Sequence, residues 1–132
     1  MSDKYSNTEI NREKFCPFLV KLYYKENEFN SLEDMNAGKF PVSRELHIYT
    51  WMDASLRELT MLIRDSLDFA KRKDANLNFS FIFPDSKGVL QRKEIGNVHT
   101  NKKYNDDIKN LKQLSFSVGD YIDICIKTSS QN

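Results

Sequence analysis

The chain has 132 residues, of which 39% are hydrophobic and 30% charged, which is the length and composition of one ordinary globular domain. The 20 Lys and Arg residues nearly balance the 19 Asp and Glu residues, and the formal charge of +1 gives no reason to expect a nucleic-acid or membrane partner through bulk charge. No run approaches the roughly 18 apolar residues of a membrane span, and the start, M-S-D-K-Y-S-N-T, lacks the apolar region of a secretory signal.

The first third of the chain predicts a tail, a strand and a long connection. Residues 1–14 are polar and charged, and we expect a flexible N-terminal tail. Pro17 then opens an apolar run, F-L-V-K-L-Y-Y, whose alternation indicates a strand with one buried face. Residues 25–44 have no clean period and are punctuated by Gly and Pro. The apolar side chains of this connection are expected to pack back onto the domain rather than lie in water.

The segment E-L-H-I-Y-T at 45–50 predicts a second strand, and the helix after it has the clearest local signal. Ser55 and Glu58 match the S-x-x-E capping box, in which each side chain binds the backbone amide of the other residue. Five apolar residues at helical spacing then predict the face that enters the core: Leu56, Leu59, Leu62, Ile63 and Leu67. The basic run at 71–73 suits the negative end of the helix dipole.

Three more strands are predicted in the second half of the chain. L-N-F-S-F-I-F at 77–83 and V-L-Q-R-K-E-I-G at 89–96 flank the turn P-D-S-K-G, and Y-I-D-I-C-I at 121–126 is the last strand. Residues 97–113 are polar and rich in Asn, Lys and Asp, so we expect a mobile loop there.

The order of these elements predicts the fold. Two strands, one helix and three strands indicate an α+β fold of the ubiquitin-like β-grasp type, a mixed sheet of about five strands packed on one main helix. The first and last strands would lie side by side in the middle of the sheet, which suits their apolar runs. Another α+β fold would share this order. The domain would span residues 15–127, with residues 128–132 as a short C-terminal tail.

The sequence lacks the motifs of an enzyme or a metal site. It contains no G-x-S-x-G, no H-E-x-x-H and no glycine-rich phosphate loop, so we expect neither catalysis nor a cofactor. A zinc site usually draws its ligands from close pairs, whereas the candidate ligands are solitary: Cys16, His47, His99 and Cys125. We therefore expect no metal, two buried cysteines and two surface histidines. Buried thiols suit a reducing compartment, the cytosol or nucleus.

Aromatic residues point instead to protein binding. Nine Phe, six Tyr and one Trp are more than one core face holds. Tyr49 and Trp51 have the parity opposite to Leu46 and Ile48, so they would lie on the outer sheet face or its rim, where such side chains are favoured interface anchors. Trp51 has two open interpretations: a staple over the helix N-terminus, or an anchor for a partner. The candidate protein-binding residues are Phe40, Pro41, His47, Tyr49, Trp51 and Met52.

Short basic clusters support a second hypothesis. The candidates for contact with nucleic acid are Lys71, Arg72, Lys73, Arg92 and Lys93, and Lys102 with Lys103 forms a further cluster. These clusters lack the interleaved exposed aromatics of an RNA-recognition motif, so a solvated surface is the simpler interpretation. The alternative is weak phosphate contact within a larger RNA–protein assembly.

Four segments carry a resemblance to a known family. They read R-E-K-F-C-P-F-L-V at 12–20, E-L-H-I-Y-T-W-M-D-A-S-L-R-E-L at 45–59, R-K-E-I-G at 92–96 and G-D-Y-I-D-I at 119–124. In this order, from about residue 12 to 126, the chain resembles the family of the Sin-associated polypeptide of eighteen kilodaltons.

The resemblance implies a ubiquitin-like, non-enzymatic adaptor without a cofactor. It implies membership of the Sin corepressor, which contains histone deacetylases and represses transcription. It also implies a place in the apoptosis- and splicing-associated assembly with Acinus or Pinin and the serine-rich RNA-binding protein, which works with the exon junction complex on messenger RNA. The expected location is the nucleus, with the cytoplasm as a second location.

Two local features depart from relatives or from ubiquitin itself. The stretch K-E-N-E-F at 25–29 is acidic where the family has a His pair and an Arg, so no basic contact is expected from it. A conjugated modifier would need an exposed Gly-Gly carboxyl end, whereas this sequence ends T-S-S-Q-N. We therefore expect a binding module rather than a modifier.

Overall fold

One mixed sheet of five strands forms the centre of the computed structural model, which describes residues 10–67 and 74–128. The strands are β1 (Phe18–Glu26), β2 (Glu45–Thr50), β3 (Ala75–Pro84), β4 (Leu90–His99) and β5 (Tyr121–Thr128). Their spatial order is β2-β1-β5-β3-β4. The pair β1 and β5 is parallel and every other neighbouring pair is antiparallel. This is the predicted ubiquitin-like β-grasp, with the first and last strands adjacent.

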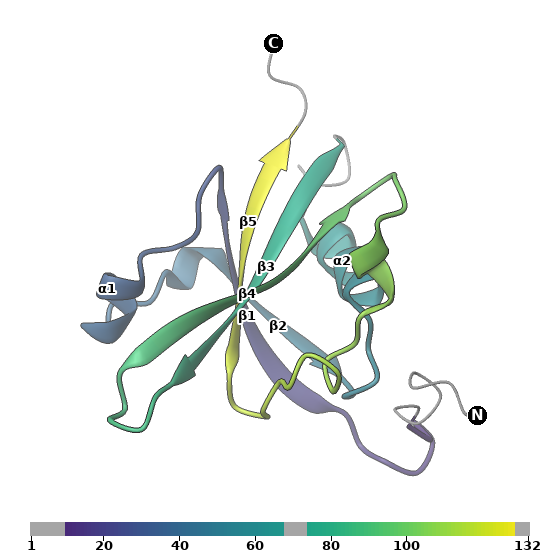
Figure 1. The fold of residues 1–132 in the computed structure, drawn as a ribbon, viewed down its shortest axis with the longest axis horizontal. Coiled ribbons are helices and arrows are strands. Elements are labelled where there is room, and N and C mark those ends of the chain that lie inside the picture. Colours follow the sequence, from purple (N-terminus) through teal and green to yellow (C-terminus); the bar gives the residue numbers. More distant parts are fainter. Residues whose placement is uncertain (1–9, 68–73, 129–132) are drawn as a thin grey trace.

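Helix α2 (Leu56–Ser66) covers one face of this sheet (Figure 1). Its start is fixed as predicted, because the Ser55 hydroxyl accepts a hydrogen bond from the Glu58 amide at 3.0 Å. Leu62 was wrongly predicted as core: it is 37% exposed, since the helix buries a narrower stripe than the apolar pattern indicates. The core between helix and sheet includes Val20, Leu22, Leu59, Ile63, Phe79 and Ile124.

A second layer covers part of the opposite face. The connection between β1 and β2 contains helix α1 (Leu32–Asn36) and the 3-10 helix η2 (Val42–Arg44), which lie across the sheet from α2 (Figure 1). Met35 is buried there against Tyr23 and Ile82 of the sheet. Leu32, Met35 and Phe40 of this connection thus pack back onto the domain as predicted, whereas Val42 is 75% exposed. The sheet has an apolar cluster on each face.

A buried ionic network ties this second layer to the sheet. Asp123, fully buried in β5, receives hydrogen bonds from the amide and side-chain nitrogens of Asn30 at 3.0 and 2.7 Å. Arg92 of β4 forms an ion pair with the same carboxylate at 2.7 Å and donates to the Asn30 carbonyl at 2.7 Å. The Arg92 guanidinium also lies over the Phe29 ring. Arg92 of β4 and Asp123 of β5 thus hold the start of the β1–β2 connection against the sheet.

Burial sets the protonation behaviour of this carboxylate. Desolvation raises the pKa of Asp123 above its ordinary value, although the Asn30 hydrogen bonds and the Arg92 charge act in the opposite direction. The folded state therefore favours the protonated acid more than the unfolded state does. The resulting cost to stability is absent below the unfolded pKa of roughly 3.9 and grows as the pH rises through the folded pKa.

Residues 97–113 contain more regular structure than predicted. The first of them complete β4, and the 3-10 helix η3 (Asn105–Ile108) follows. Leu111 is fully buried and belongs to the main core. Asp107 is also buried, which the prediction of a mobile polar loop did not indicate. Polar composition concealed this order because long-range partners, rather than a local period, hold the segment in place.

We predict that Arg92→Met lowers the free energy of unfolding by about 3 to 5 kcal/mol at neutral pH, because it leaves the Asp123 charge buried and unpaired. Without Arg92 the pKa of Asp123 rises further, so the loss relative to wild type should shrink when the pH falls to about 5. Urea denaturation at both pH values measures this. Lys93→Met, one residue away and exposed, is the control; an equal loss in that variant, or a pH-independent loss, contradicts the prediction.

Candidate partner-binding site

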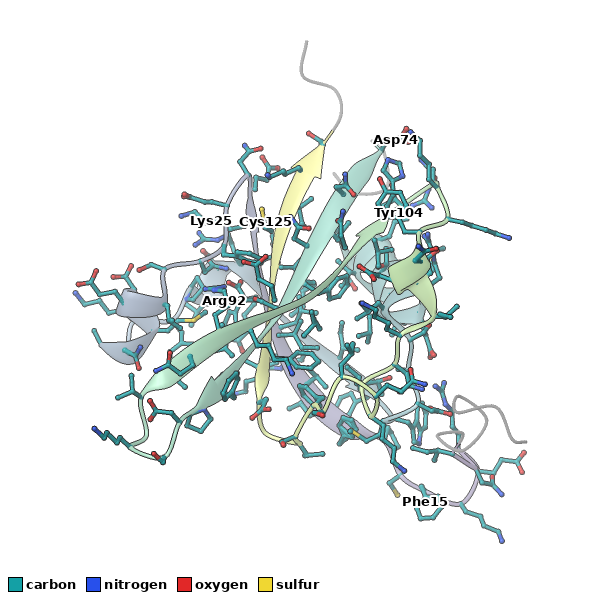
Figure 2. All side chains as sticks on the ribbon, in the orientation of Figure 1. Phe15, Lys25, Asp74, Arg92, Tyr104 and Cys125 are labelled. Carbon is teal, nitrogen blue, oxygen red and sulfur yellow. The ribbon has the colours of Figure 1, made fainter. Side chains whose placement is uncertain are left out.

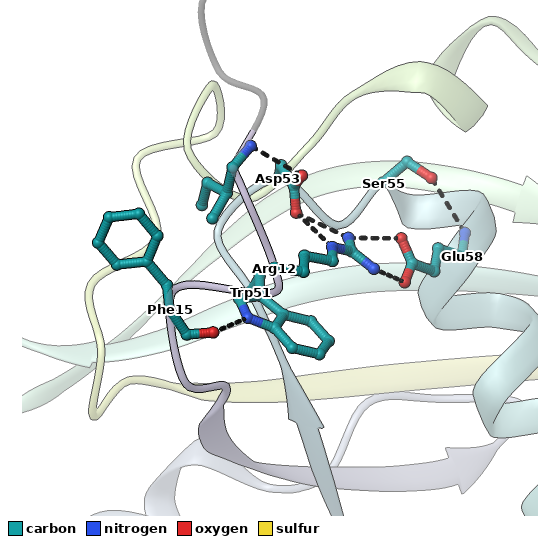
Figure 3. Close-up of polar contacts among 7 residues, drawn as sticks. Arg12, Phe15, Trp51, Asp53, Ser55 and Glu58 are labelled. Atoms are coloured by element: carbon teal, nitrogen blue, oxygen red, sulfur yellow. Dashed lines mark hydrogen bonds and ion pairs between the residues drawn. The ribbon is translucent and has the colours of Figure 1, made fainter.

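The N-terminal segment docks beside the entrance of α2. Arg12 forms ion pairs with Asp53 at 2.7 Å and Glu58 at 2.8 Å, each through two hydrogen bonds of its guanidinium (Figure 3). The backbone amide of Ile10 also donates to Asp53 at 3.1 Å. These contacts extend the domain to residue 10, within the stretch that sequence analysis assigned to a flexible tail. Residues 1–9 lie outside the described chain.

The electrostatics at this corner are those of a tight ion pair. The hydrogen bond with Glu58, followed by that with Asp53, raises the pKa of Arg12 above its ordinary value despite partial burial. Glu58 stands in the first turn of α2. Its carboxylate binds Arg12 from a distant segment, in place of the local capping partner that the S-x-x-E motif predicts.

Trp51 is clamped between strand β2 and this N-terminal segment. Its indole N–H donates to the Phe15 carbonyl at 2.7 Å (Figure 3), and the Arg12 guanidinium carbon lies 4.7 Å from the ring centre. The indole is half-buried and belongs to neither apolar cluster. Arg12 joins the indole to Glu58 of α2, and both the staple and the anchor interpretations of Trp51 stay predictions.

An open apolar pocket of about 200 Å³ lies against the indole. We call it the Trp51 pocket, and its lining is Ile10, Phe15, Cys16, Phe18, Trp51 and Met52. Phe15 is 60% exposed, and Figure 2 shows its ring at the outer edge of the molecule. An exposed aromatic rim beside a preformed apolar pocket is a suitable place for a large side chain of a partner.

Of the other predicted protein-binding residues, Phe40 packs inside the domain. Its ring lies 5.6 Å from that of Tyr23 and 5.2 Å from that of Tyr121, within the cluster under α1. Pro41 is half-buried and directly precedes η2. These two residues therefore belong to the second layer and do not line the Trp51 pocket.

His47 and Tyr49 lie on β2, an edge strand, and both are exposed. The His47 ring contacts the Glu45 carboxylate, and this hydrogen bond lowers the pKa of Glu45. Tyr49 is 65% exposed. The predicted set therefore divides, because Trp51 and Met52 meet in one pocket while His47 and Tyr49 occupy the neighbouring strand surface.

Two of the five candidates for nucleic-acid contact, Arg92 and Lys93, lie in the part of the chain that the structure describes. Lys71, Arg72 and Lys73 lie outside the described residues. Arg92 is committed to Asp123 and to the Asn30 carbonyl, whereas Lys93 is exposed. Arg92 thus has its guanidinium occupied inside the protein.

The four candidate zinc ligands do not gather in a metal-binding group within the described residues. No group of three or more His, Cys, Asp or Glu residues that could hold a metal ion occurs in the described part of the chain. Cys125 is buried as predicted, and burial raises the pKa of its thiol. The predictions for Cys16 and His99 were wrong: Cys16 is exposed at the pocket rim, and His99 is buried at the end of β4.

Sequence reasoning missed the role of Arg12. The residue sits in a polar stretch with no periodicity, and its acceptors lie 41 and 46 positions away. A weak signal existed in the first of the quoted family segments, which begins at Arg12, before the first strand.

Among the described helices, none combines the length and apolar character needed to cross a membrane.

Residues 9–126 match the model of a protein family described as Sin3 associated polypeptide p18 (SAP18). The chain belongs to this family. "Histone deacetylase complex subunit SAP18" of Arabidopsis thaliana is 42% identical over 120 residues, which cover 89% of this chain and 78% of that protein. The human protein of the same name is 40% identical over 119 residues, covering 89% and 77%. The Drosophila melanogaster protein is 37% identical over 127 residues, covering 96% and 84%.

The match to the SAP18 family confirms the resemblance inferred from the four sequence segments. A solved structure that the chain is similar to is the solution structure of the C-terminal ubiquitin-like domain of mouse tubulin-specific chaperone e. The TM-score is 0.45 at 16% identity, with 88% of this chain and 92% of that chain covered. The fold assignment itself rests on the strand order and pairing described above.

We predict that Arg12→Met releases the N-terminal segment and exposes Trp51. The substitution keeps an apolar stem but removes the hydrogen bonds to Asp53 and Glu58, so the emission of the single tryptophan should shift to longer wavelength. The loss of stability should be modest, roughly 1 kcal/mol, because the pair is partly exposed. Lys14→Met in the same segment is the control; identical emission spectra for Arg12→Met and wild type would contradict the clamp.

Proposed function

We propose that this chain is a non-enzymatic adaptor subunit of a histone deacetylase corepressor complex. The observation that carries the proposal is the family membership, with relatives in plants, insects and humans that share the name "Histone deacetylase complex subunit SAP18". In this role the domain binds other subunits and contributes to transcriptional repression through assembly. The deacetylation chemistry belongs to its partners.

The Trp51 pocket supplies a surface for this role. A rigid wall of Trp51 and Phe18, an exposed Phe15 and the flexible thioether of Met52 form an apolar recess at the edge of the sheet. Aromatic side chains fix a partner at low entropic cost, and Met adapts to its shape. The recess is preformed, because Arg12 and the indole hydrogen bond hold its walls.

The finer part of the proposal concerns the second assembly that the resemblance implies. We propose that the same domain joins Acinus or Pinin and the serine-rich RNA-binding protein in the splicing-associated complex linked to the exon junction complex. Nuclear location, with the cytoplasm as a second location, is part of this proposal. Family membership supports it, and a binding measurement with an Acinus-derived peptide at micromolar concentration tests it.

Direct RNA contact within such an assembly is the alternative function. Exposed Lys93 supports it, whereas Arg92 is engaged by Asp123 and Asn30. Because phosphate contacts release counterions, RNA affinity through lysines must fall as salt rises. A titration with single-stranded RNA at two salt concentrations therefore distinguishes this role from the adaptor role.

We predict that the tagged wild-type chain recovers histone deacetylase activity from a nuclear extract, and that Phe15→Ser and Trp51→Ala each recover clearly less. Both substitutions remove apolar area from the Trp51 pocket. Phe15→Ser should leave the melting temperature nearly unchanged because the ring is largely exposed, whereas Trp51→Ala should lower it through the lost clamp. Deacetylase assays of the eluates and thermal melting of the purified variants measure the two effects.

The matched control is Val118→Ser, which alters a side chain of similar exposure, 64%, outside the Trp51 pocket. It should recover as much activity as wild type. Absence of deacetylase activity with the wild-type chain would reject the proposed function. Equal recovery with wild type and both pocket variants would reject the Trp51 pocket as the contact surface.

A further inference from the structure

A second, larger concavity adjoins the first turn of α2. It is an open cleft of about 870 Å³ between the first turn of α2 and the segment that joins β4 to η3 and includes η3. We call it the lysine cleft, and the lining residues that matter here are Arg57, Lys102, Lys103, Tyr104, Asp107 and Ile108. It shares no lining residue with the Trp51 pocket.

Hydrogen bonds hold the walls of the lysine cleft in place. Arg57 of α2 donates to the carbonyls of Lys102 at 2.6 Å and Thr100 at 3.3 Å, and it forms an ion pair with Asp107 at 2.9 Å. The same Asp107 carboxylate accepts from the Tyr104 amide at 3.1 Å. The Arg57 side chain thus joins α2 to the backbone of the polar segment. Because these bonds hold both walls, the cleft is preformed.

The charge in this cleft is not balanced. The carboxylate of Asp107 is neutralised by Arg57, which leaves Lys102 and Lys103 as the remaining charged groups of the lining. Both lysines are exposed, and neither forms an ion pair within the described chain. Asp74 lies nearby and accepts a hydrogen bond from Asn101. Figure 2 shows Asp74 and Tyr104 at the same end of the molecule.

The cleft also offers apolar surface next to its lysines. Ile108 is 61% exposed, which is unusual for an isoleucine in an ordered segment. The half-buried Tyr104 ring lies beside it in the lining, with its centre 6.0 Å from that of His99. The lysine cleft therefore combines two unpaired cations with one exposed aliphatic side chain.

We propose that the lysine cleft binds an acidic peptide segment of a partner protein, with one large apolar side chain against Ile108 and carboxylates beside Lys102 and Lys103. Charge complementarity selects the acidic flanks, and the apolar contact supplies an anchor. RNA fits less well, because only two cations are free, Arg57 is occupied and the Tyr104 ring already packs against His99. The surface is distinct from the proposed deacetylase-complex contact at Trp51.

The test is fluorescence anisotropy with purified full chain and a fluorescein-labelled peptide, Glu-Glu-Asp-Leu-Phe-Glu-Asp-Glu. We expect binding that weakens with salt, and binding weaker by about tenfold in the double variant Lys102→Glu/Lys103→Glu, where two attractions become repulsions. Ile108→Ser should also weaken it. A peptide with Ser in place of Leu and Phe should bind less tightly than the parent peptide.

The matched control is Lys39→Glu/Lys87→Glu, which makes the same charge change at two exposed lysines outside the cleft and should bind like wild type. Circular dichroism of both double variants checks that they are folded. No binding to wild type, an equal loss in the control, or tighter binding of labelled oligouridine than of the peptide would each overturn the proposal. The readout needs no deacetylase partner, so its failure is separate from failure of the proposed function.

Discussion

The ion pair between Arg92 and the fully buried carboxylate of Asp123 is the interaction on which the two-layer structure depends. A carboxylate in the middle of a sheet is costly unless charge and hydrogen bonds compensate it. Here the compensation comes from Asn30, at the start of the β1–β2 connection, and from Arg92 on an edge strand. The buried Asp123 carboxylate thus determines that the β1–β2 connection covers the sheet face opposite α2. Apolar contacts alone leave this placement loosely defined.

An ion pair between an arginine and a carboxylate also holds an irregular segment at two other places. Arg12 joins the N-terminal segment to Asp53 and Glu58, and Arg57 joins the segment around Lys102 to α2 through Asp107. In each case a planar, always-charged guanidinium binds a carboxylate and, for Arg57 and Arg92, backbone carbonyls as well. Irregular segments with little apolar surface thereby acquire defined positions, and both candidate binding concavities lie beside such an arginine.

The apolar periodicity of the sequence predicted the strands and the helix that bury apolar faces. It failed for segments whose positions depend on contacts between residues far apart in the sequence. The alternation in F-L-V-K-L-Y-Y and the spacing of Leu56, Leu59 and Ile63 suffice for the sheet, the helix and their order. Leu62 was wrongly assigned to the core because the apolar spacing does not show where the buried face of the helix ends. Arg12 and Asp107 were missed because their partners lie 41 to 50 positions away, and no local pattern encodes such a pair.

The composition of the Trp51 pocket has a consequence for assembly in the cell. Its two walls come from residues 10–18 and 51–52, and they meet only when β1 pairs with β2 and the indole reaches the Phe15 carbonyl, 36 positions away. A chain that has not completed this pairing has no pocket. On the proposed binding mode, a complex that engages the chain through Trp51 would incorporate only molecules in which this pairing is complete, so that assembly would select folded chains.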